Sequence, residues 1–225
     1  STNASFSTNN RLTNIKVACK TINGTVVQPG ETFSFNKAWG ERTTKKGYKA
    51  AGALENGMHT QQVGGGICQV STTLFNAVAK ADLTIVDRSP HTIPSVYVDL
   101  GKDAAVNWNN QDFKFKNTSL YPVYIVATLG KDKKVNFSIY GKLLDDGVTI
   151  KIASKRTGVV NPGADQIIVD SSLAPGEQVV VEKARKGYSA ETYRVYYDAN
   201  GKEIDRQRLF KSVYRSAGAV IRVGK

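Results

Sequence analysis

A cysteine that closely follows three consecutive glycines is the residue of this chain best suited to chemistry. Cys68 lies in the run Gly64-Gly65-Gly66-Ile67-Cys68, at the start of a segment with helical apolar spacing. Glycines allow a sharp turn and close approach of a ligand. The first turn of a helix stabilises a thiolate through unpaired N–H groups and the helix dipole. The pattern predicts a nucleophilic thiol; the structural alternative is a small buried side chain at a tight turn.

A cysteine nucleophile needs a base or a positive neighbour to ionise at neutral pH. The chain holds two histidines, His59 and His91. We favour His91, because Pro90 and a following strand would fix its position and an antiparallel return would bring it beside the helix start. A carboxylate that orients this imidazole would complete a triad, and Asp103 and Asp99 are both candidates.

The polar groups next to the predicted nucleophile are candidates for substrate binding. Backbone N–H groups of the turn that contains Gly65 and Gly66 would hold the oxyanion that forms at an attacked carbonyl. Gln69 and Ser71 follow in the first turn of the helix, where capping is the ordinary role of such side chains. We predict that all four residues contribute to the substrate site.

Arg88 is the remaining candidate for substrate binding. It stands three residues before His91, and its planar guanidinium suits a substrate carboxylate. The structural alternative is a salt bridge with Asp87 or Asp99.

A zinc site is a rival to the thiol chemistry. Cys68, His59 and His91 are all zinc-ligand types, but their spacing matches no standard zinc pattern and no fourth ligand stands out. The glycine run also lacks the lysine of a phosphate-binding loop. We therefore expect no metal and no cofactor.

Two helices and several strands must position these residues. Helical apolar spacing predicts helices over residues 9–23 and 69–81. Cys19 falls on the apolar face of the first helix and is expected in the core, although pairing with Cys68 stays open. Strands are expected at 32–35, 83–86, 93–100, 112–116, 121–129 and 134–140, and residues 36–66 are expected to be mostly loop with short strands. The first domain, residues 1–141, is therefore expected to be α+β, with two helices and a mostly antiparallel sheet.

The rest of the chain reads as strands. Short β-branched runs occur at 148–152, 166–169 and 178–182. Asn200-Gly201, between two further strand-like runs, is a strong hairpin signal. Residues 141–147 are the candidate hinge, and 142–225 are expected to form a small all-β domain without a catalytic constellation.

The composition limits the choice of partner. The 225 residues are 40% hydrophobic and 22% charged, as expected of a folded chain. The net charge of +12 is spread over both halves and favours an anionic partner such as an acidic cell-wall polymer. No nucleic-acid-binding signature is present, so nucleic acid is not expected. No apolar run approaches the ~20 residues of a membrane helix, so we expect no membrane insertion within this segment.

The chain resembles a known family in its longest motif. Residues 64–77, with Arg88-Ser89-Pro90-His91 and Gly101-Lys102-Asp103-Ala104-Ala105-Val106, are similar to the VanW family. The stretch 21–36 resembles the front end of that family, and the match covers roughly residues 1–141. The tail, through Pro175-Gly176-Glu177 and residues 193–208, is similar to the G-five domain of extracellular bacterial proteins.

The resemblance implies an activity and a location. Some VanW proteins are understood as L,D-transpeptidases that form 3-3 crosslinks between peptidoglycan stem peptides with a cysteine nucleophile. It implies that Cys68 is this nucleophile, with His91 and Arg88 as candidates by motif position. The expected location is the cell wall of a Gram-positive bacterium, with an anchoring segment upstream of Ser1.

Two other functions stay open at the level of sequence. One is a non-catalytic protein that binds the cell wall and uses the glycine turn as a peptide pocket. The other is a carboxypeptidase, in which water rather than an amine resolves the thioester.

Overall fold

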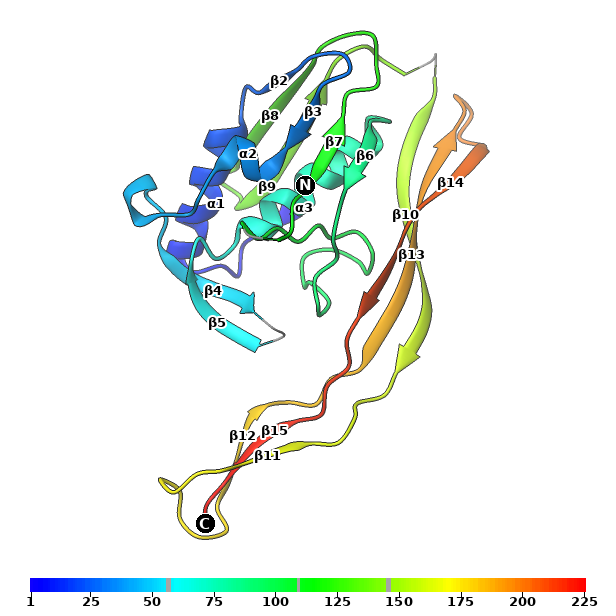
Figure 1. Cartoon of the computed structure of the whole chain (residues 1–225). Coiled ribbons are helices and arrows are strands. Elements are labelled where there is room, and N and C mark those ends of the chain that lie inside the picture. Colours follow the sequence, from blue (N-terminus) through cyan, green and yellow to red (C-terminus); the bar gives the residue numbers. More distant parts are fainter. Residues whose placement is uncertain (56–57, 109, 145–146) are drawn as a thin grey trace.

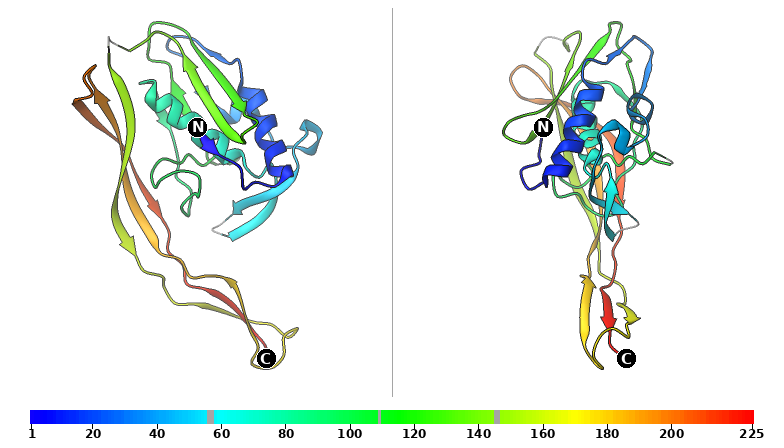
Figure 2. Two further views of the ribbon diagram at one scale, coloured as in Figure 1. Left: turned by 180° about the vertical axis from the view of Figure 1, so that it is seen from behind. Right: turned by 90° about the vertical axis from the view of Figure 1, so that its left-hand side faces the viewer.

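The chain folds into an α+β body from which long strands extend to a small distal sheet that carries the C-terminus (Figure 1). The structure is a computed structural model, which describes the chain apart from residues 56–57, 109 and 145–146 and the side chains of residues 54–59. Two further views show that the long strands run alongside the body before they reach the distal sheet (Figure 2).

Two long helices form where the apolar spacing predicts them. Helix α1 spans Asn9–Ile22. Its N-cap is Thr8, whose side chain accepts a hydrogen bond from the Arg11 N–H. Helix α3 spans Ile67–Lys80 and buries most of its first three turns. Cys19 is 2% exposed on the inner face of α1, which confirms that it is a core residue.

A four-stranded antiparallel sheet packs against both helices. Its order is β1-β9-β8-β2, and β8 and β9 pair along their whole length. The strand bounds are β1 Thr2–Asn3, β2 Val26–Val27, β8 Val123–Leu129 and β9 Lys134–Tyr140. Buried and exposed residues alternate along β8, so that Val123, Ile125 and Ala127 face the core.

Smaller elements complete the body. The sheet β3-β7-β6 comprises β3 Thr32–Ser34, β6 Thr84–Asp87 and β7 Lys114–Lys116. The segment predicted as mostly loop holds helix α2 Phe35–Trp39, a 3₁₀ turn at Thr44–Lys46, and the hairpin of β4 Ala50–Glu55 and β5 Met58–Val63.

One predicted strand is wrong. Residues 93–100 form bends and irregular backbone in place of a strand. Two prolines, Pro90 and Pro94, remove backbone donors there, and a proline restricts its predecessor as well. The segment is instead part of an irregular loop that begins before it, at His91, and includes Ser95.

The C-terminal part is all-β. A three-stranded antiparallel sheet, in the order β10-β13-β14, comprises β10 Thr149–Val160, β13 Gly187–Tyr197 and β14 Glu203–Tyr214. The distal sheet comprises β11 Gln166–Val169, β12 Gln178–Glu182 and β15 Val220–Val223, with β11 parallel to β15. The predicted hairpin at Asn200-Gly201 joins β13 to β14. These elements confirm the expected fold class, while the domain boundary at 141/142 stays a prediction.

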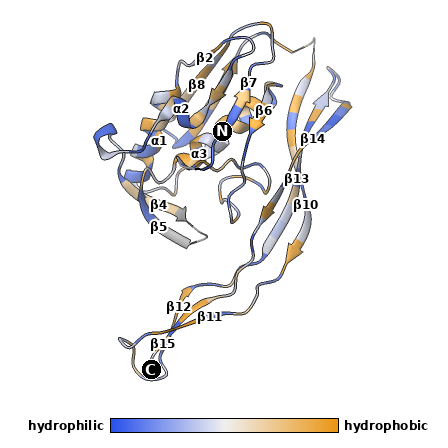
Figure 3. Cartoon of the chain, viewed as in Figure 1, coloured by the Kyte–Doolittle hydropathy of each residue, from blue (hydrophilic) through white to orange (hydrophobic). Residues whose placement is uncertain are grey.

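The long sheet packs on the α+β body rather than standing apart from it. Ile150 and Ile152 of β10 belong to the same buried cluster as the helices. Arg194 of β13 donates to the carbonyl oxygen of Ala79, in the last turn of α3, and to that of Leu83, which follows the helix. The distal sheet differs: its valines and isoleucines are largely exposed, and Figure 3 shows these strands as hydrophobic. The body and the long sheet therefore share one core, whereas the distal sheet adds little to it.

Candidate active site

The glycine run forms a tight turn that delivers Cys68 to the start of α3. Gly64 and Gly66 have φ angles of 84° and 110°, values that favour glycine. A Cβ atom on Gly65 would lie 2.3 Å from the backbone oxygen of Ala51, so the hairpin packs directly against the turn. Each of the three glycines is therefore required by the backbone itself.

Asn14, a buried residue of α1, forms hydrogen bonds that fix this turn. The Asn14 side-chain amide donates to the carbonyl oxygens of Gly65 and Lys49, both at 2.9 Å, and its Oδ1 accepts the Lys49 N–H at 2.8 Å. Asn14 is 0% exposed. The sequence reasoning missed this residue, although a polar residue on the apolar face of a helix is a signal that could have found it.

Backbone donors remain free at the turn. The N–H groups of Gly65, Ile67 and Gln69 donate to backbone oxygens of the same turn. In the described part of the chain, this leaves the N–H groups of Gly66 and Cys68 without an acceptor. Such groups beside a half-buried thiol can stabilise an oxyanion.

The structure brings Cys68, His91 and Asp103 together. The Cys68 Sγ lies 3.4 Å from the Val106 carbonyl oxygen, and the His91 imidazole is close enough to lower the pKa of the thiol. The His91 Nδ1 lies 2.6 Å from the Asp103 Oδ2, and the His91 backbone N–H donates to the same oxygen at 2.7 Å. Because Nδ1 is engaged by Asp103, Nε2 is the ring nitrogen left to face the thiol. Asp99, the other candidate acid, pairs with Lys102 instead.

The charges in this cluster favour an ion pair. Burial by itself raises the pKa of Cys68, but the hydrogen bond and charge of His91, with a contribution from Arg42, outweigh it and lower that pKa below its ordinary value. Burial would lower the pKa of His91, yet its hydrogen bonds with Asp103 and Cys68 raise that pKa to about 9. Both shifts favour a thiolate–imidazolium pair over a neutral thiol beside a neutral imidazole.

The other cysteine lacks this environment. Burial alone raises the pKa of Cys19 to about 12, and both cysteines are free thiols. Cys19 is thus inert and not paired with Cys68.

The prediction that Arg88 binds substrate is corrected. Its side chain is 1% exposed and forms a salt bridge with Asp103 at 2.9 Å. It also donates to the backbone oxygens of Asp103 and Gly101, to the Ser212 Oγ, and lies over the Phe210 ring. Arg88 is fully used inside the protein, where it helps to hold the carboxylate that orients His91.

Gln69, Ser71 and Gly65 are also buried and do not face a substrate. The Gln69 Nε2 donates to the Asn3 carbonyl oxygen at 2.9 Å, and the Ser71 Oγ donates to the Ala104 carbonyl oxygen at 2.6 Å. These bonds tie α3 to the N-terminal strand and to the loop before Val106. Of the four residues predicted near the nucleophile, Gly66 alone is half-buried, at the surface of the turn.

Side chains of the C-terminal sheet contact the cluster of Cys68, His91 and Asp103. The Tyr214 hydroxyl donates to the Asp103 Oδ1 at 2.5 Å and accepts the Gly101 N–H at 2.6 Å. The Thr192 Oγ1 donates to the Gly101 carbonyl oxygen at 2.8 Å. The sequence reasoning assigned no role to this sheet, because alternating strand residues give no sign of a contact more than a hundred positions away.

Three further residues near Cys68 were also missed. The Tyr97 ring meets the His91 ring edge to face, with centroids 6.4 Å apart. Arg42 donates to the Val106 carbonyl oxygen, and Arg11 of α1 lies against Gly66. Neither arginine had a sequence signal beyond the charge itself.

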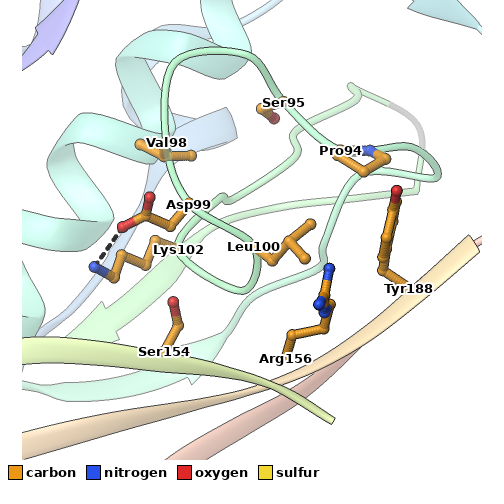
Figure 4. Close-up of a pocket in the computed structure, with 9 residues that line it drawn as sticks. All are labelled: Pro94, Ser95, Val98, Asp99, Leu100, Lys102, Ser154, Arg156 and Tyr188. Atoms are coloured by element: carbon orange, nitrogen blue, oxygen red, sulfur yellow. Dashed lines mark hydrogen bonds and ion pairs between the residues drawn. The ribbon is translucent and has the colours of Figure 1, made fainter. Parts of the chain in front are cut away.

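A cavity of about 670 Å³ lies beside the loop that carries His91. Figure 4 shows Pro94, Val98 and Leu100 of this loop facing Ser154 and Arg156 of β10 and Tyr188 of β13. Ser95, which also lines it, contacts the His91 Nδ1 at 3.1 Å. The cavity is therefore lined by a residue that contacts His91, but neither His91 nor Cys68 lines it.

The zinc alternative gains no support from the described residues. No group of three histidine, cysteine, aspartate or glutamate side chains among them could hold a metal ion. His59 lies on β5, but its side chain is outside the described residues. In the described part of the chain, no helix combines the length and apolar character needed to span a membrane.

Solved structures resemble the C-terminal part. The G5 domain of IgA1 protease matches 35% of this chain and 89% of its own length, at 17% identity and a TM-score of 0.24. The structure titled HP0197-G5 matches 34% of this chain and 97% of its own length, at 19% identity and a TM-score of 0.19.

Two curated relatives each match a little over half of this chain. The uncharacterized protein YoaR of Bacillus subtilis (strain 168) is 50% identical over 121 residues, which cover 54% of this chain and 40% of that protein. The vancomycin B-type resistance protein VanW of Enterococcus faecalis (strain ATCC 700802 / V583) is 35% identical over 129 residues, 55% of this chain and 47% of that protein. The chain thus spans less than half the length of either relative.

Family models cover nearly the whole chain. Residues 10–140, which contain Cys68, His91 and Asp103, match the family described as VanW like protein, and residues 155–225 match the G5 domain. The chain therefore belongs to the VanW-like protein family and carries a G5 domain after its VanW-like domain.

Proposed function

We propose that this protein is a cysteine acyltransferase, an L,D-transpeptidase that forms 3-3 crosslinks between peptidoglycan stem peptides. The observation that carries the proposal is the half-buried Cys68 thiol in contact with His91, whose Nδ1 is held by Asp103. This is the arrangement of nucleophile, base and orienting acid that acyl transfer requires.

The first half of the reaction forms a thioester. The Cys68 thiolate attacks the carbonyl carbon of the L-centre residue in a donor tetrapeptide, and the N–H groups of Gly66 and Cys68 hold the oxyanion. The bond to the terminal D-alanine then breaks. The His91 imidazolium gives its proton to the departing amine, so the thioester forms beside a neutral imidazole.

The second half transfers the acyl group to a neighbouring stem peptide. The acceptor amine attacks the thioester carbonyl, and the neutral His91 takes its proton. Collapse of the tetrahedral intermediate forms the new amide and expels the Cys68 thiolate, which restores the ion pair. Water in place of the amine would give a carboxypeptidase, so the acceptor decides between the two activities.

The charge and the family fit a location outside the cell. A net charge of +12 favours retention among anionic wall polymers. The VanW-like family and the G5 domain favour association with the cell wall, and we propose that the stem peptides and these polymers are the partners.

The products made from purified tetrapeptide stems test this function. Wild-type protein is expected to yield 3-3 crosslinked dimers, and the variant Cys68→Ala none. The matched control is Cys19→Ala, which removes the inert thiol and should retain crosslinking in proportion to its folded fraction. Cleavage of D-alanine without dimers would support the carboxypeptidase. Binding to sacculi by wild type and Cys68→Ala alike, without any turnover, would support the non-catalytic wall protein.

A further inference from the structure

Two arginines flank the glycine turn beside the thiol and are free to meet an anion. Arg42 comes from the loop after α2, and Arg11 comes from the first turns of α1. Both are half-buried. Neither forms a salt bridge with any carboxylate in the described part of the chain, whereas Arg88 forms one with Asp103.

Arg42 is directed to the thiol side of the turn. Its Nη2 donates to the Val106 carbonyl oxygen at 3.4 Å, and the Cys68 Sγ lies 3.4 Å from that same oxygen. A Cβ atom on Gly64 would lie 2.6 Å from the Arg42 Cδ, and the guanidinium carbon is 5.3 Å from the Trp39 ring centroid. The glycine and the ring thus fix the stem of the side chain, and most of its donors stay available.

Arg11 approaches the turn from the opposite element. A Cβ atom on Gly66 would lie 2.9 Å from the Arg11 Cγ and 3.1 Å from its Nη1. The Nη2 donates to the Gln69 Oε1 at 2.8 Å, and the Nε donates to the Ser7 Oγ at 3.1 Å. The neutral partners hold the guanidinium in place without cancelling its charge.

We propose that Arg42 and Arg11 bind the terminal carboxylate of the donor peptide, the group on the residue that leaves. The proposal rests on the proposed function. That carboxylate is only three covalent bonds from the carbonyl carbon that Cys68 attacks, so its binding site must lie next to the thiol. A planar guanidinium on either side of the turn matches a carboxylate in charge and hydrogen-bonding geometry.

Peptide binding to the Cys68→Ala protein tests this proposal without turnover. The probes are a stem tetrapeptide with a free terminal carboxylate and the same peptide with a terminal amide, measured by calorimetry. The acid is expected to bind about 10- to 100-fold more tightly, the range of hydrogen bonds to charged groups. Adding Arg42→Gln should remove most of this preference, and adding Arg11→Gln as well should remove the rest. The matched control Arg222→Gln removes the same charge from the distal sheet and should leave the preference intact.

The outcomes separate this proposal from the proposed function. Equal affinity for acid and amide, binding of neither peptide, or a preference that survives the loss of both arginines would overturn the carboxylate site. Crosslinking by wild-type protein that ignores the terminal carboxylate would overturn the site and leave the transpeptidase standing. A carboxylate preference without any turnover would support the site and count against the enzyme.

A second inference rests on different contacts, those of the C-terminal sheet. Tyr214 is 2% exposed, and its hydroxyl bridges the Asp103 carboxylate and the Gly101 N–H. Two residues earlier on β14, the Ser212 Oγ accepts from Arg88 at 2.7 Å, and just after the strand the Arg215 N–H donates to the Thr92 carbonyl oxygen at 2.8 Å. We infer that Tyr214 is a positioning residue, which acts through Asp103 to hold His91 against the thiol.

The variant Tyr214→Phe tests this inference, because it keeps the ring and removes only the hydroxyl. With Asp103 less well held, His91 stabilises the thiolate less, so the pH at half-maximal alkylation of Cys68 should rise. Turnover should fall about 5- to 10-fold with KM nearly unchanged, as expected for one hydrogen bond.

The matched control is Tyr196→Phe. The Tyr196 hydroxyl also joins the long sheet to the body, through the Asp82 Oδ1 at 2.6 Å, but in the described part of the chain it bonds to none of Arg88, His91 and Asp103. It should lose a similar amount of thermal stability while its alkylation profile stays that of wild type. The same profile in both variants would overturn the positioning role of Tyr214, and a shift confined to Tyr214→Phe would support it.

Discussion

Replacing His91 by alanine is expected to slow iodoacetamide alkylation of Cys68 at pH 7 by at least about 10-fold. Without the imidazolium, burial dominates and the pKa of Cys68 rises, so little thiolate remains at neutral pH. Turnover of stem peptides should fall by about 10²- to 10⁴-fold, because in the proposed mechanism His91 moves both protons. Timed alkylation followed by mass spectrometry gives the rate at each pH.

The pH dependence of the alkylation rate should differ between wild type and the alanine variant. In wild-type protein the thiolate is paired with an imidazolium whose pKa is about 9, so the alkylation rate should stay nearly constant from neutral pH up to that value. In the alanine variant the rate should instead climb steadily through this range as the unpaired thiol ionises. The variant His91→Gln keeps a hydrogen-bonding side chain without the charge. Its alkylation rate should climb with pH as that of the alanine variant does. Identical profiles for all three proteins would show that His91 does not set the reactivity of Cys68.

Replacing Arg88 by methionine is expected to lower the free energy of unfolding by about 3–5 kcal/mol. The substitution removes one of the two cationic partners of the buried Asp103 carboxylate, since only His91 remains, and it leaves the Ser212 hydroxyl and the Gly101 carbonyl oxygen without the donor that Arg88 supplies. A substrate-binding arginine at the surface would instead change KM and leave stability almost unchanged. Denaturant unfolding followed by circular dichroism measures the difference directly.

The loss of unfolding free energy in Arg88→Met should become smaller as the pH falls. Burial acts to raise the pKa of Asp103, but its bonds to His91 and the charges of His91 and Arg88 lower that pKa below the ordinary 3.8. The stability gained in this way is present above pH 3.8 and is lost as the pH falls through the lower folded value. The gap between wild type and Arg88→Met should therefore narrow in acid. The control Lys102→Met, which breaks the partly exposed pair with Asp99, should cost at most about 1 kcal/mol. Equally small losses of unfolding free energy in Arg88→Met and Lys102→Met would contradict the view that Arg88 stabilises the buried Asp103 carboxylate.

The local features of the site were predictable from sequence because they depend on neighbours in the chain. The glycine run and the start of α3 follow from turns and apolar spacing, and His91 was preferred to His59 because Pro90 restricts the backbone before it. The helices lie within about two residues of their predicted bounds, the usual uncertainty at helix ends. Cys19 was placed in the core by the same spacing.

The long-range features were not predictable. Arg88 looked like a substrate ligand because nothing in the sequence indicates that Asp103, Ser212 and Phe210 enclose it. The segment 93–100 alternates like a strand, yet Pro94 and its contacts with His91 make it a loop. Tyr214 lies in a strand whose pattern describes only its own sheet. Side chains that meet across more than a hundred residues leave no local trace.

The most direct test is the intact mass of the protein after brief incubation with a stem tetrapeptide and an acid quench. The account predicts an added mass equal to the tetrapeptide less its terminal D-alanine, bound to Cys68 and absent from Cys68→Ala. A wild-type protein that gains no mass, or that retains the whole tetrapeptide, would contradict acyl transfer by this thiol.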